Sequence, residues 1–210
     1  MAGRPRQFDT ETALLRARDL FWEHGYEGVS MSDLVKALDL ASARIYAAFG
    51  SKEELFRRAI LLYEEGEGGF AERALNSDLP VFDAVELMFT SAVELYTKKR
   101  KRRPLGCMVV SSAINCTPQN EAIGKWLQEH RRQLTGSIIR RFRVAVEQGE
   151  LAMTQNPQTL GDLCATMLHG ISVQARDGVS KERLLAGVRM QMSVLVNPDA
   201  RFPIIRSAGH

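Results

Sequence analysis

The stretch Ser30–Leu55 constrains the fold of this chain more than any other. It reads SMSDLVKALDLASARIYAAFGSKEEL, in which Ser30 and Asp33 have the spacing of a capping box. The apolar residues that follow at helical spacing predict a short helix that ends near Asp39. A second short helix, expected over about residues 41–48, would carry small and polar side chains outward. Two short helices joined by a tight turn form the helix-turn-helix that reads the major groove of DNA.

Two motifs, FWEHGYEGVSMSDL and ARIYAAFGSKEELF, extend this pattern over about residues 8–58. In order and spacing they resemble the N-terminal DNA-binding domain of TetR/AcrR-family transcriptional regulators. That family usually has glycine in the turn where this chain has Asp39, and aspartate tolerates a left-handed conformation better than most residues. The resemblance implies an all-α protein, in which an N-terminal three-helix helix-turn-helix domain precedes a C-terminal helical ligand-binding and dimerisation domain, with about nine helices in total.

Three segments are expected along the chain. Residues 1–51 would form the helix-turn-helix DNA-binding domain, with a basic arm over residues 1–7. Residues 52–196 would form the helical effector-binding and dimerisation domain, and residues 197–210 a loosely ordered tail. Glycine costs about 1 kcal/mol in a helix interior, so the sequence GEGG at 66–69 predicts a kink in the first long helix of the second domain.

Composition places the chain among ordinary globular proteins, with 45% hydrophobic and 25% charged residues. No apolar run approaches the roughly 18 residues that a membrane span needs, and the basic N-terminus lacks the apolar core of a signal peptide. The three cysteines are widely spaced and odd in number, which favours a reducing cytoplasm over a disulfide scaffold. We therefore expect a cytoplasmic protein with no membrane partner.

The chain lacks the short motifs that mark many catalytic sites. It has no HExxH, GxSxG, P-loop, GxGxxG or CxxC pattern, and it contains only four histidines. An enzyme is therefore not expected, and neither is a metal site or a cofactor.

Residues that reach DNA bases should lie at the start of the second short helix and face outward. These are Ala41, Ser42, Ala43 and Arg44. Arg44 is the sharpest candidate, because a bidentate contact between arginine and guanine is the commonest specific one. A phosphate contact or a surface ion pair is the alternative for Arg44.

A second group of residues would hold the DNA backbone. The resemblance assigns phosphate contacts to Ser30, Tyr46 and Lys52, where a helix N-terminus, a hydroxyl and an ammonium group could each bind a phosphate oxygen. Tyr46 could instead belong to the core. Arg4 and Arg6 flank a proline in the N-terminal arm, which would either enter the minor groove or remain a solvated tail.

An effector pocket is expected among the helices of residues 52–176. Inward-facing aromatic, methionine and histidine side chains are natural walls for such a pocket, although the same side chains could simply be core. The candidates are Phe89, Tyr96, Met108, Trp126, Met167 and His169. The arginines between residues 131 and 143 are expected to be solvent-exposed. The sequence does not identify the effector.

Cys107 raises a second route of control. It lies in a GC sequence similar to one in which some repressors of this broad family sense oxidants or electrophiles through a cysteine. Reactivity requires exposure and a lowered thiol pKa, and the cations at 101–103 could supply the second. The alternative is a small buried side chain without reactivity.

The run KKRKRR at Lys98–Arg103 supplies six positive charges, whereas the whole chain has a net charge of only +3. A solvated loop is the simplest interpretation. The preceding helix should return towards the DNA-binding domain, so a phosphate contact that steepens the salt dependence of DNA binding is the alternative.

The last two helices, expected over about residues 156–176 and 180–196, are rich in small residues. In proteins that this chain resembles, the last two helices pack against the same pair of a partner as a four-helix interface, so the resemblance implies a homodimer. A regulator that reads two half-sites about 34 Å apart also requires two copies.

These features together predict a DNA-binding transcriptional regulator. We expect a homodimeric repressor that binds a palindromic double-stranded DNA operator near its own gene. A small-molecule effector in the C-terminal pocket would favour a conformation whose recognition helices no longer match the operator. Two alternatives stay open: a repressor of the same fold that senses oxidants or electrophiles through Cys107, and a helical adaptor that binds protein alone.

Overall fold

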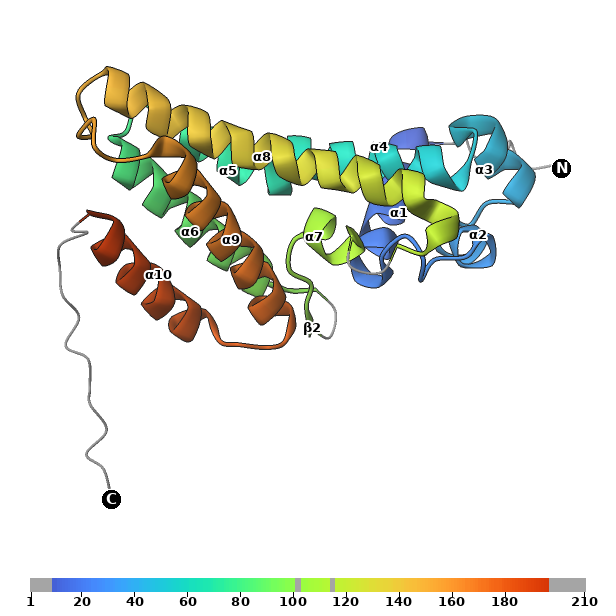
Figure 1. Cartoon of the computed structure of the whole chain (residues 1–210). Helices are drawn as coiled ribbons and strands as arrows, with labels where there is room; N and C mark the ends of the chain where they lie inside the picture. Colours follow the sequence, from blue (N-terminus) through green and yellow to red (C-terminus); the bar gives the residue numbers. More distant parts are fainter. Residues whose placement is uncertain (1–8, 101–102, 114–115, 197–210) are drawn as a thin grey trace, which may run out of the picture.

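The computed structural model describes residues 9–100, 103–113 and 116–196. These residues form ten α-helices, two 3-10 helices and one antiparallel pair of two-residue strands (Figure 1). The α-helices are α1 (Thr10–His24), α2 (Met31–Leu38), α3 (Ser42–Phe49), α4 (Lys52–Glu65), α5 (Phe70–Leu75), α6 (Val81–Thr97), α7 (Met108–Ala113), α8 (Glu121–Glu147), α9 (Pro157–Arg176) and α10 (Lys181–Val196). The other elements are η1 (Glu67–Gly69), η2 (Pro118–Asn120), β1 (Lys99–Arg100) and β2 (Arg103–Pro104). The predicted all-α fold is confirmed.

Helices α1, α2 and α3 form a small head whose boundaries follow from local sequence signals. Asp9 caps α1 by accepting a hydrogen bond from the backbone of the first turn at 3.1 Å, and Gly25 ends it with φ of 73°. Ser30 and Asp33 form the predicted capping box at the start of α2. Asp39 ends α2 in the left-handed conformation, with φ of 57° and ψ of 45°. Aspartate therefore supports the turn in which glycine was expected.

An aromatic cluster holds the head against α4. The ring centroid of Phe56 on α4 lies 5.1 Å from those of Phe21 and Tyr26. Further along α4, Tyr63 packs edge-on against Trp22 with 4.6 Å between centroids. Helix α4 therefore belongs to the core of the head as well as linking it to the body. The predicted division of the chain at residue 51 stays a prediction.

The predicted interruption of the first long helix lies between α4 and α5. Gly66 ends α4, and the 3-10 helix η1 follows before α5 begins at Phe70. A Cβ atom at Gly68 would lie 2.3 Å from the ring of Tyr63, so this close approach requires glycine. The break accounts for ten α-helices where about nine were expected.

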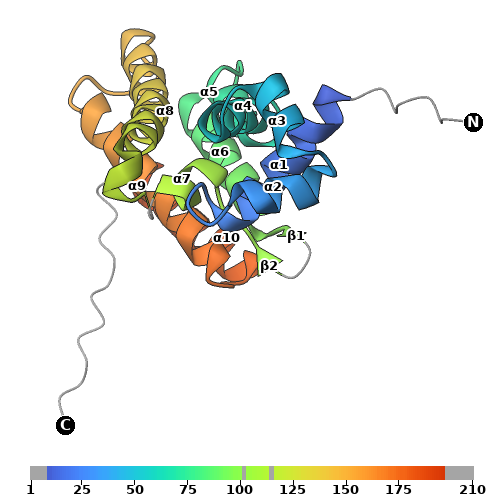
Figure 2. The same cartoon turned by 90° about the vertical axis from the view of Figure 1, so that its right-hand side faces the viewer.

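The remaining helices form an elongated body beside the head. Helix α8 runs along the body and reaches the head with its N-terminal end (Figure 1). Figure 2, seen from the head end, shows α9 and α10 on the other side of the molecule from α3. One hydrophobic cluster joins α5, α6, α8, α9 and α10, and a second joins the head to α4, α7 and the first turns of α8. None of the described helices is long and apolar enough to cross a membrane.

The basic run Lys98–Arg103, for which a solvated loop was the simplest expectation, contributes Lys99 and Arg100 to β1 and Arg103 to β2. Its Arg100 lies in β1, which pairs with β2. The Arg100 guanidinium lies 4.2 Å from the ring centroid of Trp22 and 3.3 Å from the carboxylate of Asp19, and it also pairs with Glu67. These partners on α1 and η1 hold β1 against the head. The two central residues of the run lie outside the described residues, and a contact of the run with DNA stays a prediction.

The prediction that the arginines of α8 face solvent is wrong for Arg131 and Arg141. Both are half-buried. Arg131 follows the buried Leu127 by four residues and so shares its helix face. Arg141 donates a hydrogen bond to the carbonyl of Leu79 at 2.6 Å and lies 3.7 Å from the Glu150 carboxylate. Their apolar neighbours at helical spacing turn both side chains towards other helices.

Candidate functional site

Helix α3 presents its polar face outward from a firmly packed inner face. Ile45 and Phe49 are each 1% exposed and anchor α3 in the core of the head. Between and before them, the side chains predicted to meet DNA are exposed: Ser42, Ala43, Arg44 and Tyr46. Tyr46 is 49% exposed, so the alternative that it belongs to the core is wrong. This arrangement gives α3 the form that a recognition helix requires, with a rigid back and an accessible front.

The predicted phosphate-binding residues flank this helix. Ser30 is exposed at the N-terminus of α2, where its hydroxyl accepts a hydrogen bond from the backbone N–H of Asp33 at 3.1 Å. Lys52 opens α4, and its Nζ lies 4.1 Å from the ring centroid of Tyr26. Burial lowers the pKa of Lys52, whereas the negative charge of Glu27 opposes this shift.

The predicted N-terminal arm and C-terminal tail lie outside the described residues. Arg4 and Arg6 belong to that arm, so their minor-groove contacts stay a prediction.

The body contains a mostly apolar cavity with about 50 Å³ of free space between α4 and α9. Its polar and sulfur-containing lining residues are Tyr63, Glu64, Tyr96, Cys107, His130, Arg131 and His169. Its apolar lining includes Phe70, Val109, Val110, Leu134 and Leu168. Such a combination of apolar walls and a few polar groups is typical of small-molecule sites.

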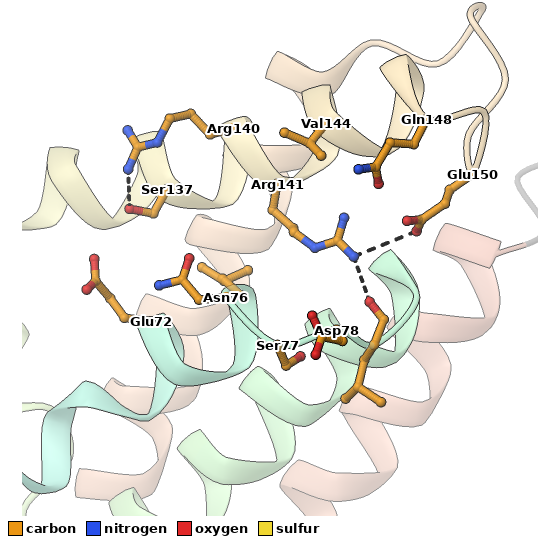
Figure 3. Close-up of a pocket in the computed structure, with 12 residues that line it drawn as sticks. Glu72, Asn76, Ser77, Asp78, Ser137, Arg140, Arg141, Val144, Gln148 and Glu150 are labelled. Atoms are coloured by element: carbon orange, nitrogen blue, oxygen red, sulfur yellow. Dashed lines mark hydrogen bonds and ion pairs between the residues drawn. The ribbon is translucent and has the colours of Figure 1, made fainter.

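A larger opening of about 570 Å³ lies where α5, the connection to α6 and the C-terminal part of α8 meet (Figure 3). Arg141 and Glu150 face each other across it, and Glu150 also accepts a hydrogen bond from the backbone N–H of Val81 at 2.7 Å. Arg140 donates to Ser137 at 2.7 Å. Because it is open to solvent and these charged groups already have partners, we regard it as a surface groove and the interior cavity as the candidate effector site.

Comparison with known proteins identifies the group of regulators to which the chain is related. A family model for bacterial regulatory proteins of the tetR family matches residues 13–59. The HTH-type transcriptional repressor BdcR of Escherichia coli (strain K12) is 30% identical over 90% of this chain and 89% of its own length. The chain belongs to the TetR family. The HTH-type transcriptional repressor ComR of the same strain is 29% identical over 90% of this chain and 91% of its own length.

A solved structure adds the DNA complex of a TetR-family relative. A cysteine mutant of the regulator CifR, complexed with 26-bp double-strand operator DNA, is 38% identical and matches with a TM-score of 0.84. The match covers 90% of this chain and 98% of that one. The present protein is therefore a DNA-binding transcriptional regulator of the TetR family, whose members are not enzymes. This result removes the alternative of an adaptor that binds protein alone.

The TetR-family body brings only two of the six predicted pocket residues to the interior cavity. Tyr96 and His169 line it. The other four pack into or against the two hydrophobic clusters and are not among its lining residues: Phe89, Met108, Trp126 and Met167. Large apolar side chains at helical spacing are more often part of a packed core than of a pocket. The sequence pattern of a pocket wall is the same as that of a core, so the sequence alone does not separate the two.

Sequence reasoning missed Tyr63 and Arg131 as cavity residues. Both carried a usable signal, because each interrupts an apolar stripe with a polar group. Tyr63 follows the buried Ile60 by three residues, and Arg131 lies between the inward-facing Leu127 and Leu134. A polar side chain inside such a stripe is either a structural partner or part of a site.

Two sets of contacts connect the cavity of this TetR-family regulator to its head. Trp22 of α1 donates its indole N–H to the carbonyl of Gly106 at 2.9 Å, and Gly106 precedes the cavity residue Cys107. Trp22 also packs on the cavity residue Tyr63. A movement of Tyr63 or Cys107 in the cavity would therefore change the contacts of Trp22 on helix α1.

The second set of contacts fastens the start of α8 to the head. The Glu27 carboxylate accepts hydrogen bonds from the backbone N–H of Thr117 at 2.8 Å and from the side chain of Asn120 at 2.9 Å. Burial raises the pKa of Glu27, but these hydrogen bonds outweigh it, so the pKa lies below its ordinary value. Glu27 is consequently ionised at neutral pH and links α8, which carries Arg131, to the head.

Proposed function

We propose that this protein is a homodimeric repressor that binds a palindromic operator near its own gene and is released by a small molecule. The exposed front of α3, with Arg44 above the buried Ile45 and Phe49, is the observation that carries the proposal. Two further findings support it. The relatives BdcR and ComR are named as repressors, and the relative CifR has been solved in complex with operator DNA. In this account Arg44 contacts a base, while Ser30, Tyr46 and Lys52 contact phosphates.

The proposed dimer interface is the outer face of α9 and α10. Leu163 and Val173 on α9 are 43% and 40% exposed, and Met190 on α10 is 56% exposed. A Cβ atom at Gly170 or Gly187 would meet no heavy atom within 4 Å, so both glycines leave space beside these side chains. Exposed apolar side chains next to small residues favour close packing against the same helices of a second copy.

Release would depend on the contacts that join the cavity to the head. A ligand can shift a conformational equilibrium only by binding two states with different affinity. Tyr63 and Cys107 line the cavity and also connect to Trp22 of α1, directly or through Gly106. Ligand binding would therefore favour a different placement of the head, in which the two α3 helices no longer match successive half-sites.

Replacing Met190 by arginine should separate the dimer without unfolding the chain. Wild-type protein is expected to have the mass of two chains, and Met190→Arg the mass of one, because a charge in an apolar interface loses its hydration without gaining a partner. The monomer should also bind a palindromic duplex much more weakly, since two linked heads bind together more tightly than one. Light scattering after size-exclusion chromatography measures the mass.

Leu61→Arg is the matched control for this variant. Leu61 is 46% exposed on α4, so the same chemical change is made at a similar exposure away from α9 and α10. The control should remain dimeric, and both variants should keep wild-type helical content by circular dichroism. A dimeric Met190→Arg protein, or a monomeric wild type, would contradict the proposed interface.

A second candidate is control by oxidants or electrophiles through Cys107. One observation favours it: Cys107 is half-buried in the lining of the same cavity as Arg131. Cys164 provides an internal reference, since burial raises the pKa of its thiol to about 12. Cys107 should then react with iodoacetamide faster than an ordinary free thiol, and a rate at or below that level would exclude this candidate.

A further inference from the structure

We propose that the effector of this regulator is a small organic acid, a monocarboxylate of a few carbon atoms whose carboxylate binds Arg131 and Tyr63 in the interior cavity. The inference rests on the proposed release by a small molecule and names the class of that molecule. It begins with two buried polar groups that have no hydrogen-bond partner among the described residues.

The first of these groups is Nη1 of the Arg131 guanidinium. Arg131 lines the cavity from α8, and its Nη1 atom is buried without a hydrogen-bond partner among the described residues. Buried polar groups in proteins nearly always have partners, so an orphaned donor points to a missing ion or ligand. A planar guanidinium matches a carboxylate, since two parallel N–H groups can each donate to one of its oxygens.

The second of these groups is the hydroxyl of Tyr63. The side chain is 2% exposed, and its hydroxyl makes no hydrogen bond of ordinary geometry in the described part of the chain, although the Cys107 thiol lies near it. Burial raises the pKa of Tyr63 well above its ordinary value. The hydroxyl therefore keeps its proton at neutral pH and can donate it in a hydrogen bond to an anionic oxygen.

Glu64 and His169 are the other groups among the described lining residues that bear on how Arg131 would meet an anion. The Glu64 carboxylate already has a partner, because it lies 2.9 Å from Nδ1 of His130. Burial lowers the pKa of His169, and the positive charge of Arg131 lowers it further, so His169 is neutral at neutral pH. An anion that enters the cavity would therefore have the Arg131 guanidinium as its charged partner, while the Glu64 carboxylate is engaged by His130.

Size and apolar walls distinguish an organic acid from an inorganic anion. Phe70, Leu134 and Leu168 contribute apolar surface to the cavity, which favours a ligand with a hydrocarbon part. Its free space of about 50 Å³ would accommodate about four atoms the size of a water molecule. Acetate, with four non-hydrogen atoms, fits this space; propionate, with five, requires a small movement of the lining side chains, and longer acids require a larger one.

Calorimetric titration of the full chain with sodium propionate tests the inference. Propionamide, which has nearly the same shape but no charge, and sodium chloride at equal ionic strength are the reference ligands. We expect saturable binding of one propionate per chain with a Kd of about 1 mM or tighter, and no saturable binding of either reference. No saturable binding of propionate, or equal binding of propionamide, would overturn the inference.

Three variants assign the contacts. Arg131→Gln should weaken propionate binding by at least about tenfold, because a charge-assisted hydrogen bond is lost. Its neighbour Arg132 is exposed on the same helix, so Arg132→Gln changes the net charge equally and should leave binding unchanged. Tyr63→Phe should weaken binding by about two- to tenfold. Arg131→Gln should stay folded, since it removes a buried charge without a partner, and unchanged binding in it would refute the site.

Operator binding is measured separately, so that the two proposals can fail independently. Sequence-specific DNA binding without propionate binding would overturn the effector class and leave the DNA-binding function intact. Propionate binding without sequence-specific DNA binding would overturn the proposed DNA-binding function and leave the effector class intact. If both hold, propionate should weaken operator binding by the wild type and by Arg132→Gln but not by Arg131→Gln, and an equal effect on all three would contradict the role of this cavity in release.

Discussion

Replacing Arg44 by alanine should lower the preference of the regulator for its operator over unrelated DNA by about 5- to 150-fold for each recognition helix. This range corresponds to the roughly 1–3 kcal/mol that a bidentate contact with a base contributes to discrimination. Arg44 is exposed on α3 immediately before the buried Ile45, so its removal should leave the fold intact. Fluorescence anisotropy with operator and scrambled duplexes at one salt concentration measures the effect.

Arg16→Ala is the control for the Arg44 variant. Arg16 is also an exposed arginine of the head but lies on α1, so its removal changes the net charge by the same amount. It should alter binding to both duplexes equally or not at all, since phosphate contacts carry no sequence information. If Arg44→Ala weakens binding to the two duplexes by the same factor, Arg44 contacts phosphate and the specificity lies elsewhere.

Replacing Gly106 by alanine should lower the stability of the protein by about 3 kcal/mol or more. Gly106 has φ of 67°, and a Cβ atom there would lie 2.6 Å from the backbone carbonyl oxygen of Ser172 on α9. Alanine would therefore add left-handed strain of about 1–2 kcal/mol to a clash with backbone that cannot easily move. A decrease of about 6–12 °C in Tm is expected for a chain of this length.

Gly149→Ala separates the two contributions. Gly149 has φ of 77°, but a Cβ atom there would meet nothing within 4 Å, so this variant carries the strain without the clash. It should lose only about 1 kcal/mol. Equal decreases in Tm for the two variants, measured by circular dichroism, would show that the contact with Ser172 does not restrict position 106. Gly106→Ala should also disturb the hydrogen bond from Trp22 that connects the cavity region to the head.

The head could be predicted from sequence because its determinants are local. The capping box of Ser30 and Asp33, the terminal Gly25 and the exposed front of α3 each depend on residues only a few positions apart. The left-handed turn at Asp39 was predictable for the same reason. Short-range signals of this kind can be recognised in a sequence without knowledge of the tertiary structure.

The cavity could be predicted only in part, because it depends on which distant segments meet. Tyr96 and His169 line it as expected, but whether Phe89 faced a cavity or a core depended on the packing of helices far apart in sequence. The same holds for Arg100, whose partners Trp22 and Asp19 lie about 80 positions earlier. Sequence periodicity indicates which side of a helix is buried but not what the side chain meets there.

Selection of DNA by the purified wild-type protein from a pool of random-sequence duplexes tests the central claim most directly. The account predicts enrichment of one inverted repeat, bound by two chains, with an affinity at least about 10³-fold above that for the starting pool. That affinity should fall steeply as salt rises, because cations of the head displace counterions from the phosphates. A pool without an enriched sequence after repeated rounds, or an enriched sequence without an inverted repeat, would contradict a homodimeric regulator that reads DNA through α3.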